Sequence, residues 1–250
     1  MKALLMAFSM YSRLPVPDFV WEEEDRKKAM CFFPLIGVLA GAAFFLVYLF
    51  MERSGAGPVF KGAFLTAVPL LATGGIHMDG FLDTCDARAS WGDREKKLQI
   101  LKDTHAGAFA VTGGGLYLLL YCGGCSELPV RGAAAVSVGF VLSRALSGLA
   151  LSTFPKANKS GSLSMFSDAA QKKILLGTLT LWILACGAAA LWLNPVIGGI
   201  MLLTQAAVFW YYHHVAMKEF GGTTGDIAGF FVQVCELACA CTVMLGGKLL

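Results

Sequence analysis

Three aspartates recur at helical spacing in the segment GGIHMDGFLDTCDA, at Asp79, Asp83 and Asp86. If this segment is a helix, positions i, i+4 and i+7 lie within an arc of roughly 60°, so the three carboxylates share one face. Like charges at this spacing repel one another, and a cation relieves the repulsion. Mg²⁺ is held by carboxylates when substrate phosphates complete its shell. The spacing therefore predicts Mg²⁺-assisted chemistry on a phosphate.

Further polar residues follow in the same loop. Asp93 comes after Gly92 and before REKKLQILK, an arrangement typical of a helix N-cap. Asp103 lies at the other end of that predicted helix, beside Lys102 and His105, where a carboxylate opposes the helix dipole. Because the sequence suggests no structural role for Asp103, we expect it to be functional.

Two later segments place polar groups in or between apolar runs. Arg144 lies in VGFVLSRALSGLAL, and an arginine in mid-membrane costs about 2.5–3.5 kcal/mol. It should face a polar interior with a phosphate or one of the aspartates as partner, unless it snorkels from a span end. FGGTTGD at 220–226 can present backbone N–H groups to phosphate, with Asp226 as a metal ligand or helix cap, although it also reads as an ordinary turn. Glu236 is a further polar residue inside the last apolar run.

The elements that must position these residues are membrane helices. Of the 250 residues, 56% are hydrophobic and 15% are charged, and the mean hydropathy is +0.65. Soluble domains average about 45–50% apolar and 25% charged residues, so the composition excludes that class. The net charge of +3 implies no nucleic-acid partner. We predict an all-α, polytopic helical bundle in the lipid bilayer, formed by a single domain over residues 1–250.

Seven apolar runs are long enough to cross a bilayer core. They are roughly 31–51, 58–78, 106–123, 130–152, 174–194, 195–217 and 227–247. Residues 1–12 are predicted to form a short amphipathic helix at the interface, since Arg13 and Pro15 follow without a signal-peptide cleavage site. Most of the 20 Lys and Arg residues fall in loops on the N-terminal side of this topology. The positive-inside rule then places the N-terminus and the aspartate loop in the cytoplasm and the C-terminus outside.

The eight cysteines are not expected to form a disulfide framework. Most of them lie within apolar runs, where free cysteine behaves as a small hydrophobic residue. Cys122 and Cys125 form a CGGC, for which a redox or metal pair is the alternative.

Six blocks of sequence, in order from about residue 4 to residue 237, resemble one family: cobalamin synthase, also called adenosylcobinamide-GDP ribazoletransferase. The blocks are SRLPVP at 12–17, FPLIGVLAGA at 33–42, GGIHMDGFLDTCD at 74–86, LQILKDTHAG at 98–107, SRAL at 143–146 and GGTTGDIAG at 221–229. Ala87 stands where the family usually has glycine. Thr104 and His105 stand where it usually has Ser-Arg, and a histidine carries less charge toward a phosphate at neutral pH.

The resemblance implies a Mg²⁺-dependent transferase embedded in the cytoplasmic (inner) membrane. A ribose hydroxyl of α-ribazole, or of its 5′-phosphate, would attack the corrinoid-linked phosphorus of adenosylcobinamide-GDP and release GMP. This is the last step in assembly of the cobalamin nucleotide loop. The resemblance leaves open a homo-oligomer or an association with other enzymes of cobalamin assembly.

The same resemblance gives each polar residue an expected role. Asp79, Asp83 and Asp86 would hold Mg²⁺ on the pyrophosphate. Asp103 would be a further ligand or the base, and Arg144 and Lys102 would stabilise charge on the phosphates or on departing GMP. The expected catalytic set is Asp83, Asp103, Arg144 and Lys102, and the expected substrate-binding set is His77, His105, Gly221, Gly222, Thr223, Thr224 and Asp226.

Two other functions are weighed against this one. A CDP-alcohol phosphotransferase also uses spaced aspartates on membrane helices, but its DGxxAR and GxxxDxxxD pattern does not follow DGFLDT here. A cation-coupled transporter with Asp79, Asp83 and Arg144 along its pathway would place acidic groups near the bilayer midplane, whereas here they cluster at one predicted surface. Substrate-dependent release of GMP would separate the transferase from both alternatives.

Overall fold

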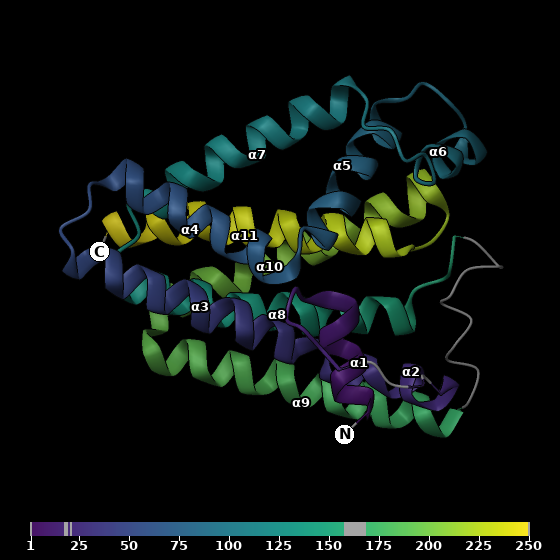
Figure 1. The fold of residues 1–250 in the computed structure, drawn as a ribbon, viewed down its shortest axis with the longest axis horizontal. Helices are drawn as coiled ribbons and strands as arrows, with labels where there is room; N and C mark the ends of the chain where they lie inside the picture. Colours follow the sequence, from purple (N-terminus) through teal and green to yellow (C-terminus); the bar gives the residue numbers. More distant parts are fainter. Residues whose placement is uncertain (1, 18–19, 21, 158–168, 250) are drawn as a thin grey trace.

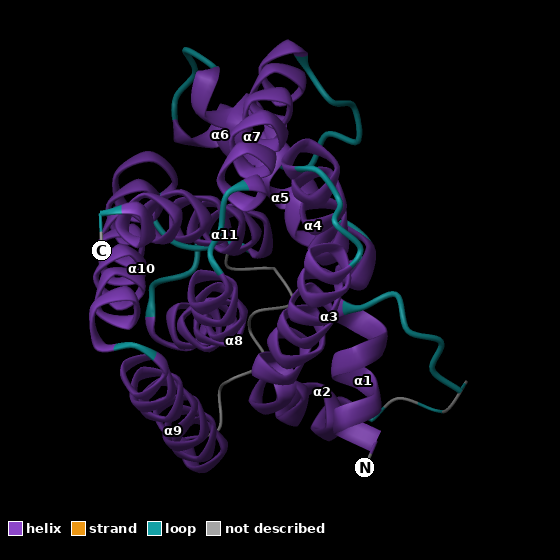
Figure 2. Cartoon of the chain, turned by 90° about the vertical axis from the view of Figure 1, so that its left-hand side faces the viewer, coloured by secondary structure: helices purple, strands orange, loops and turns teal. Residues whose placement is uncertain are grey.

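The computed structural model describes residues 2–17, 20, 22–157 and 169–249, which fold into helices and connecting loops without a β-strand (Figures 1 and 2). Met1 and Leu250, the ends of the predicted domain, lie outside the described residues. The helices are α1 (Lys2–Tyr11), α2 (Glu23–Ala29), η1 (Met30–Phe32), α3 (Phe33–Arg53), α4 (Pro58–Thr73), α5 (Ile76–Ala89), α6 (Arg94–Ile100), α7 (Ala108–Ser126), α8 (Val130–Thr153), α9 (Ala169–Leu193), α10 (Pro195–Val215), η3 (Ala216–Phe220) and α11 (Gly225–Lys248). The predicted all-α class is confirmed.

Six helical segments of the described chain are long and apolar enough to cross a membrane. They are Met30–Arg53, Ala108–Ser126, Val130–Thr153, Ala170–Leu193, Pro195–Phe220 and Gly225–Lys248. The seventh candidate is the pair α4 and α5, which passes the same test only when the two are joined. The C-terminus lies at one end of the bundle, and α2, α5 and α6 lie at the opposite end (Figure 1). The prediction of a polytopic membrane bundle is therefore confirmed.

A sharp bend changes the second predicted span. That span was expected to run from 58 to 78, but α4 ends at Thr73 and α5 leaves at 98° to it. Gly74 and Gly75 form the bend with φ angles of 65° and 80°, which glycine adopts without a Cβ penalty. The acidic segment thus turns across the end of the bundle (Figure 1), and we treat α5 as lying outside the membrane-spanning segments.

The N-terminal helix α1 packs onto this same end of the molecule. Ala3, Met6 and Ala7 are its buried residues, and it contacts α2 and α3. After α1, the Arg13 N–H donates a hydrogen bond to the Ala72 carbonyl at the end of α4, 3.0 Å away. The predicted helix is confirmed, and its placement at the membrane interface stays a prediction.

Helices α8 and α11 form the centre of the bundle. About 72% of the apolar window of α8 and 67% of that of α11 are buried, compared with 22% for α9. All eight cysteines are free, as predicted. The two central helices carry the polar residues Arg144 and Glu236, whose placement is described below.

Candidate functional site

Two glycines bring the acidic helix α5 against the start of α11. A Cβ atom at Gly80 would lie 2.6 Å from the backbone oxygen of Asp226, and one at Gly229 would lie 3.1 Å from the backbone oxygen of His77. Only residues without a side chain allow backbones to approach this closely. The GGIHMDGF and GGTTGDIAG segments, more than 130 residues apart in the sequence, therefore meet in one place.

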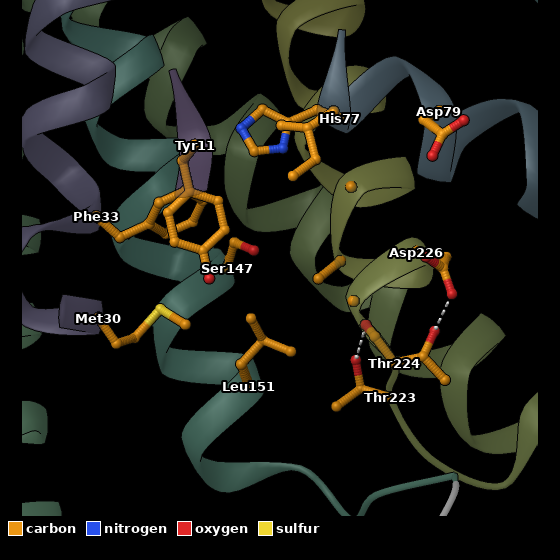
Figure 3. A pocket seen from close by; sticks show the side chains of 14 residues that line it. Tyr11, Met30, Phe33, His77, Asp79, Ser147, Leu151, Thr223, Thr224 and Asp226 are labelled. Carbon is orange, nitrogen blue, oxygen red and sulfur yellow. Dashed lines mark hydrogen bonds between the residues drawn. The ribbon is translucent and has the colours of Figure 1, made fainter. Parts of the chain in front are cut away.

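A cavity of about 270 Å³ lies at this junction (Figure 3). Its walls come from α1, η1, α3, α5, α8, α11 and the loop before α11. It is lined by Tyr11, Met30, Phe33, Ile76, His77, Asp79, Ser147, Leu151, Thr223, Thr224, Gly225, Asp226, Ala228 and Gly229. Five residues that the sequence marked as metal- or substrate-binding, His77, Asp79, Thr223, Thr224 and Asp226, therefore share one cavity.

The acidic residues act on one another electrostatically. Partial burial, followed by the negative charges of Asp79, Asp226, Asp86 and Asp103, raises the pKa of Asp83 to about 6. A carboxylate in this position is harder to ionise than a free one, and a bound cation would reverse that effect. The neighbouring negative charges thus add to the effect of burial on Asp83.

The donor chemistry of α5 fits a hard cation, but the three aspartates do not form a closed cage. Among the described residues, no three His, Cys, Asp or Glu side chains come together closely enough to hold a metal ion. Mg²⁺ commonly takes only one or two carboxylates and completes its shell with water and substrate phosphates. A role for these aspartates in holding Mg²⁺ stays a prediction.

Asp86 has a structural role that the sequence did not suggest. Its carboxylate accepts hydrogen bonds from the N–H groups of Gly107 and Ala110, the latter at 2.8 Å. These are unpaired donors at the start of α7, so Asp86 caps that helix from α5. This leaves Asp79 and Asp83 as the more available carboxylates of the three.

The loop before α11 corrects one expectation. Its backbone N–H groups were expected to receive phosphate oxygens, but the Gly222 N–H donates to Ala216 at 2.9 Å and the Thr223 N–H donates to Pro155 at 2.8 Å. The Thr223 carbonyl also accepts from the Ala157 N–H at 3.2 Å. Because the N–H groups of Gly222 and Thr223 are already bonded, these two hold the loop in place instead of binding a phosphate. Phosphate binding by the rest of the segment stays a prediction.

The cap of α11 is Thr224, not Asp226. The Thr224 side chain accepts a hydrogen bond from the Ile227 N–H at 3.3 Å, so Asp226 is not needed for capping. The Asp226 carboxylate lies 3.4 Å from the Thr224 hydroxyl and lines the cavity (Figure 3). Gly221 precedes this turn with a φ of +73°. Asp226 is therefore available for the chemistry of the site.

Asp103, His105 and Lys102 lie on the exposed loop after α6. The Asp103 carboxylate accepts a hydrogen bond from the His105 N–H at 3.0 Å and lies 2.9 Å from its ring Nδ1. These contacts with His105 lower the pKa of Asp103. The sequence suggested no structural role for Asp103, but these contacts give it one, because its carboxylate stabilises the local turn with His105. None of the three residues lines the cavity.

Asp93 is the N-cap of α6, as predicted, and accepts a hydrogen bond from the Lys96 N–H at 2.9 Å. The polar segment between α5 and α7 is therefore stabilised by hydrogen bonds to two aspartates, Asp93 before α6 and Asp103 after it.

Arg144 does face a polar interior, but its partner was not predicted. Its guanidinium forms a fully buried ion pair with Glu236 of α11, and its Nε and Nη2 atoms have no hydrogen-bond partner among the residues that the structure describes. We expected a phosphate or one of the aspartates as its partner, and this expectation was wrong for the structure, where the partner is Glu236. Because the Arg144 side chain is fully buried inside the protein, it does not snorkel to a span end. Arg144 does not line the cavity. The ion pair links α8 to α11, and a part for Arg144 in stabilising charge on the phosphates stays a prediction.

A second ion-pair cluster fixes the position of α5 and α6. Arg88 donates to Glu219 at 3.0 Å and to the Tyr211 hydroxyl at 2.6 Å. Lys97 of α6 donates to the other Glu219 oxygen at 2.9 Å. Glu219, in the turn η3, thus ties both short helices to the end of α10.

Sequence reasoning missed several residues at the site. Tyr11, Phe33 and Ser147 line the cavity, and the Arg94 guanidinium packs against Gly221. Lys156 lies beside Thr223 through a backbone bridge, and burial together with the charge of Lys172 lowers the pKa of Lys156. The signals were weak. Tyr11 immediately precedes the SRLPVP block and Ser147 follows SRAL, but only the fold brings them together.

Comparisons with known proteins show the family of the chain. A sequence model described as cobalamin-5-phosphate synthase matches residues 3–244. The adenosylcobinamide-GDP ribazoletransferase of Lachnoclostridium phytofermentans is 40% identical over 245 residues, covering 98% of this chain and 94% of that protein. Proteins with the same name from Clostridium botulinum (strain Alaska E43 / Type E3) and Carboxydothermus hydrogenoformans are both 32% identical, covering 94% and 96% of this chain and 94% and 95% of theirs. No solved structure matches.

Proposed function

The chain belongs to the cobalamin-5-phosphate synthase family, and on that premise we propose that it is an adenosylcobinamide-GDP ribazoletransferase. It joins adenosylcobinamide-GDP to α-ribazole, or to its 5′-phosphate, and releases GMP. One observation carries the proposal beyond the family likeness. The acidic helix α5 and the GGTTGD segment meet at one cavity at the end of a membrane bundle.

The carboxylates on α5 are the proposed Mg²⁺ ligands. Asp79 and Asp83 would hold the ion, with Asp86 contributing where its capping bonds allow. Bound there, Mg²⁺ would neutralise charge on the diphosphate of adenosylcobinamide-GDP. The raised pKa of Asp83 is consistent with this placement, because a bound cation would favour the ionised form of a partly buried carboxylate that has other acids around it.

The protein's own residues would position the two substrates for an in-line exchange. The ribose oxygen of α-ribazole bonds to the corrinoid-linked phosphorus, and the bond from that phosphorus to the oxygen of GMP breaks. A carboxylate would take the hydroxyl proton, and Asp103 and Asp226 are the candidates. Asp226 lines the cavity, whereas Asp103 is exposed and bonded to His105. Lys102 and His105, on the same exposed loop, would meet the negative charge of the nucleotide.

Arg144 enters this proposal as a positioning residue. It was expected to touch phosphate, but its ion pair with Glu236 holds α8 to α11 behind the cavity. The site is proposed to face the cytoplasm in the inner membrane, because the loops at its end of the bundle carry most of the Lys and Arg residues. Neither rival function is favoured. The acidic groups lie at the end of the bundle, and the buried acid Glu236 is already paired.

The test is reconstitution with the two substrates. Purified protein with Mg²⁺, adenosylcobinamide-GDP and α-ribazole should yield cobalamin and GMP in equal amounts, and a chelator should stop the reaction. Asp83→Asn should lose at least ~10³-fold in kcat, in the range of losing a charge-neutralising group. Asp93→Asn makes the same chemical change at the N-cap of α6, where asparagine also caps well, and should stay near wild type. Near-normal GMP release by Asp83→Asn at saturating Mg²⁺ would defeat the metal assignment.

A further inference from the structure

The cavity beside Asp79 has two chemically different walls. One is aromatic and apolar. The rings of Tyr11 and Phe33 have centroids 4.6 Å apart, and the His77 ring meets Phe33 edge-on at 5.7 Å. Met30 and Leu151 extend this wall (Figure 3). An aromatic wall of this kind suits the face of a planar ring system.

The other wall is polar. Asp79, Thr224 and Asp226 line it, and the Ser147 hydroxyl is directed toward the cavity (Figure 3). Ser147 is only 1% exposed, yet its hydroxyl makes no hydrogen bond with a described residue. Ser143 and Ser152 on the same helix instead donate to backbone carbonyls. The Ser147 hydroxyl is therefore left to bond a ligand or water on the cavity side.

His77 gives a second sign of a missing partner. Its side chain is 4% exposed and lines the cavity, and its Nε2 atom has no hydrogen-bond partner among the described residues. The cavity thus combines an aromatic surface with unpaired donors and acceptors. That combination matches a nucleoside, which has a planar base at one end and a ribose with several hydroxyls at the other.

Size separates the two substrates of the proposed reaction. A volume of about 270 Å³ suits a nucleoside, whereas a corrinoid macrocycle with its amide side chains is several times larger. A second, open depression of about 410 Å³ runs along α4 and α5 and shares Ile76 and Asp79 with the cavity. The large substrate therefore has an open surface on the other side of Asp79, where its size is not confined.

We propose, on the basis of the proposed function, that this cavity is the binding site of the attacking nucleoside. The aromatic base lies against Tyr11 and Phe33, and the ribose lies toward Ser147, Thr224 and Asp226. The corrinoid substrate stays outside and brings only its diphosphate to the acidic helix. The ribose oxygen then forms its bond to the corrinoid-linked phosphorus as the bond to GMP breaks, and the proton leaves through a site carboxylate to the departing GMP.

The test is a substitution that reduces the volume of the cavity on its polar side. Ser147→Leu places a larger apolar side chain where the ribose would lie, and Ser137→Leu makes the same change on α8 in a groove away from the cavity. Ser147→Leu should raise the KM for α-ribazole at least 10-fold and leave the KM for adenosylcobinamide-GDP within twofold. Ser137→Leu should change neither. A rise confined to the corrinoid substrate, or no rise at all in a folded variant, would overturn the assignment.

A measurement on the unmodified protein keeps the proposal testable if Ser147→Leu does not fold. A photoreactive benzimidazole riboside, irradiated with the wild-type protein without the corrinoid, should label peptides containing Tyr11, Phe33 or Ser147. Excess α-ribazole should suppress that labelling. Labelling only elsewhere, or labelling that α-ribazole does not suppress, would overturn the site. If the wild-type protein forms no cobalamin from the two substrates, the proposed function itself fails; an active enzyme labelled elsewhere refutes only the nucleoside site.

Discussion

The contact between α5 and α11 predicts a graded loss of activity from three glycine substitutions. In Gly80→Ala the new Cβ would lie 2.6 Å from the Asp226 oxygen and 2.8 Å from its Cα. Ordinary contact begins at 3.4 Å, so the two backbones must separate by about 0.8 Å. Backbone cannot swing aside as the end of a long side chain can, so the helices themselves must move.

The separation of the two backbones would displace residues that we propose to take part in the reaction. Asp79 and Asp83 flank Gly80 on α5, and Asp226 lies across the contact. A misplacement of about 1 Å can cost about 10²-fold in rate, or about 2.7 kcal/mol in the activation barrier. We therefore expect Gly80→Ala to lose about 10²-fold in kcat. Overpacking should also lower the free energy of unfolding, by about 1–3 kcal/mol.

Two other glycines calibrate the effect. A Cβ at Gly229 would lie 3.1 Å from the His77 oxygen, so Gly229→Ala needs a movement of only a few tenths of an ångström and should lose less activity. Gly115 on α7 has no atom within 4 Å of an added Cβ, so Gly115→Ala should keep kcat within twofold. All three exchanges add one methyl group to a helical glycine, which makes them a matched series.

The assay is the rate of GMP release by purified protein at saturating substrates, with thermal unfolding in detergent to show that each variant is folded. The expected order of kcat is Gly115→Ala, then Gly229→Ala, then Gly80→Ala. A folded Gly80→Ala protein with activity close to that of Gly115→Ala would refute the argument that this close contact sets the geometry of the site.

Three further predictions follow from single contacts. Arg144→Met should lower the free energy of unfolding by about 3–5 kcal/mol because it leaves Glu236 buried and unpaired. In thermal unfolding, the double exchange of Arg144 and Glu236 to Met should recover most of that loss. Equal instability of the single and double variants would contradict an energetic role for the ion pair. Asp86→Ala should cost about 0.5–2 kcal/mol through the lost cap of α7, and Asp86→Asn should cost less; an Asn variant that is stable but inactive would show that Asp86 also has a catalytic role. His105→Ala should raise the pKa of Asp103 only part of the way toward its ordinary value, because the side-chain contact is removed while the backbone N–H of residue 105 still donates to the carboxylate. NMR titration of the carboxyl would detect the rise, and an unchanged pKa would show that the His105 side chain is not the main cause.

Much of the bundle can be read from the sequence because long apolar runs have few folding solutions in a membrane. Six of the seven predicted spans correspond to single membrane-length helices. The prediction of one continuous helix for the second span was wrong because the apolar run continues past Thr73 through Ile76 and Met78. Hydropathy averages over a window and does not register that Gly74 and Gly75 turn the chain within that window.

The sequence identified many of the residues at the site, but it did not identify most of the contacts that these residues make. Spacing alone placed Asp79, Asp83 and Asp86 on one helical face, because the period of a helix is fixed. That Asp86 would cap α7 depends on where Gly107 lies, which is a matter of tertiary structure. Arg144 and Glu236 were each marked as unusual in a membrane, but their pairing spans 92 residues, and local pattern carries no information about it.

Asp79 is the residue at which the two halves of the proposed chemistry meet. It lines the cavity on one side and the more open depression along α4 and α5 on the other. If the bend at Gly74 and Gly75 were absent, α5 would continue the line of α4 and carry Asp79 away from Asp226. The bend and the close contact at Gly80 are therefore both required to place a carboxylate between a small enclosed site and a large open one. This arrangement suits a transferase whose two substrates differ so much in size, because the small one fits the cavity while the large one lies against the open depression.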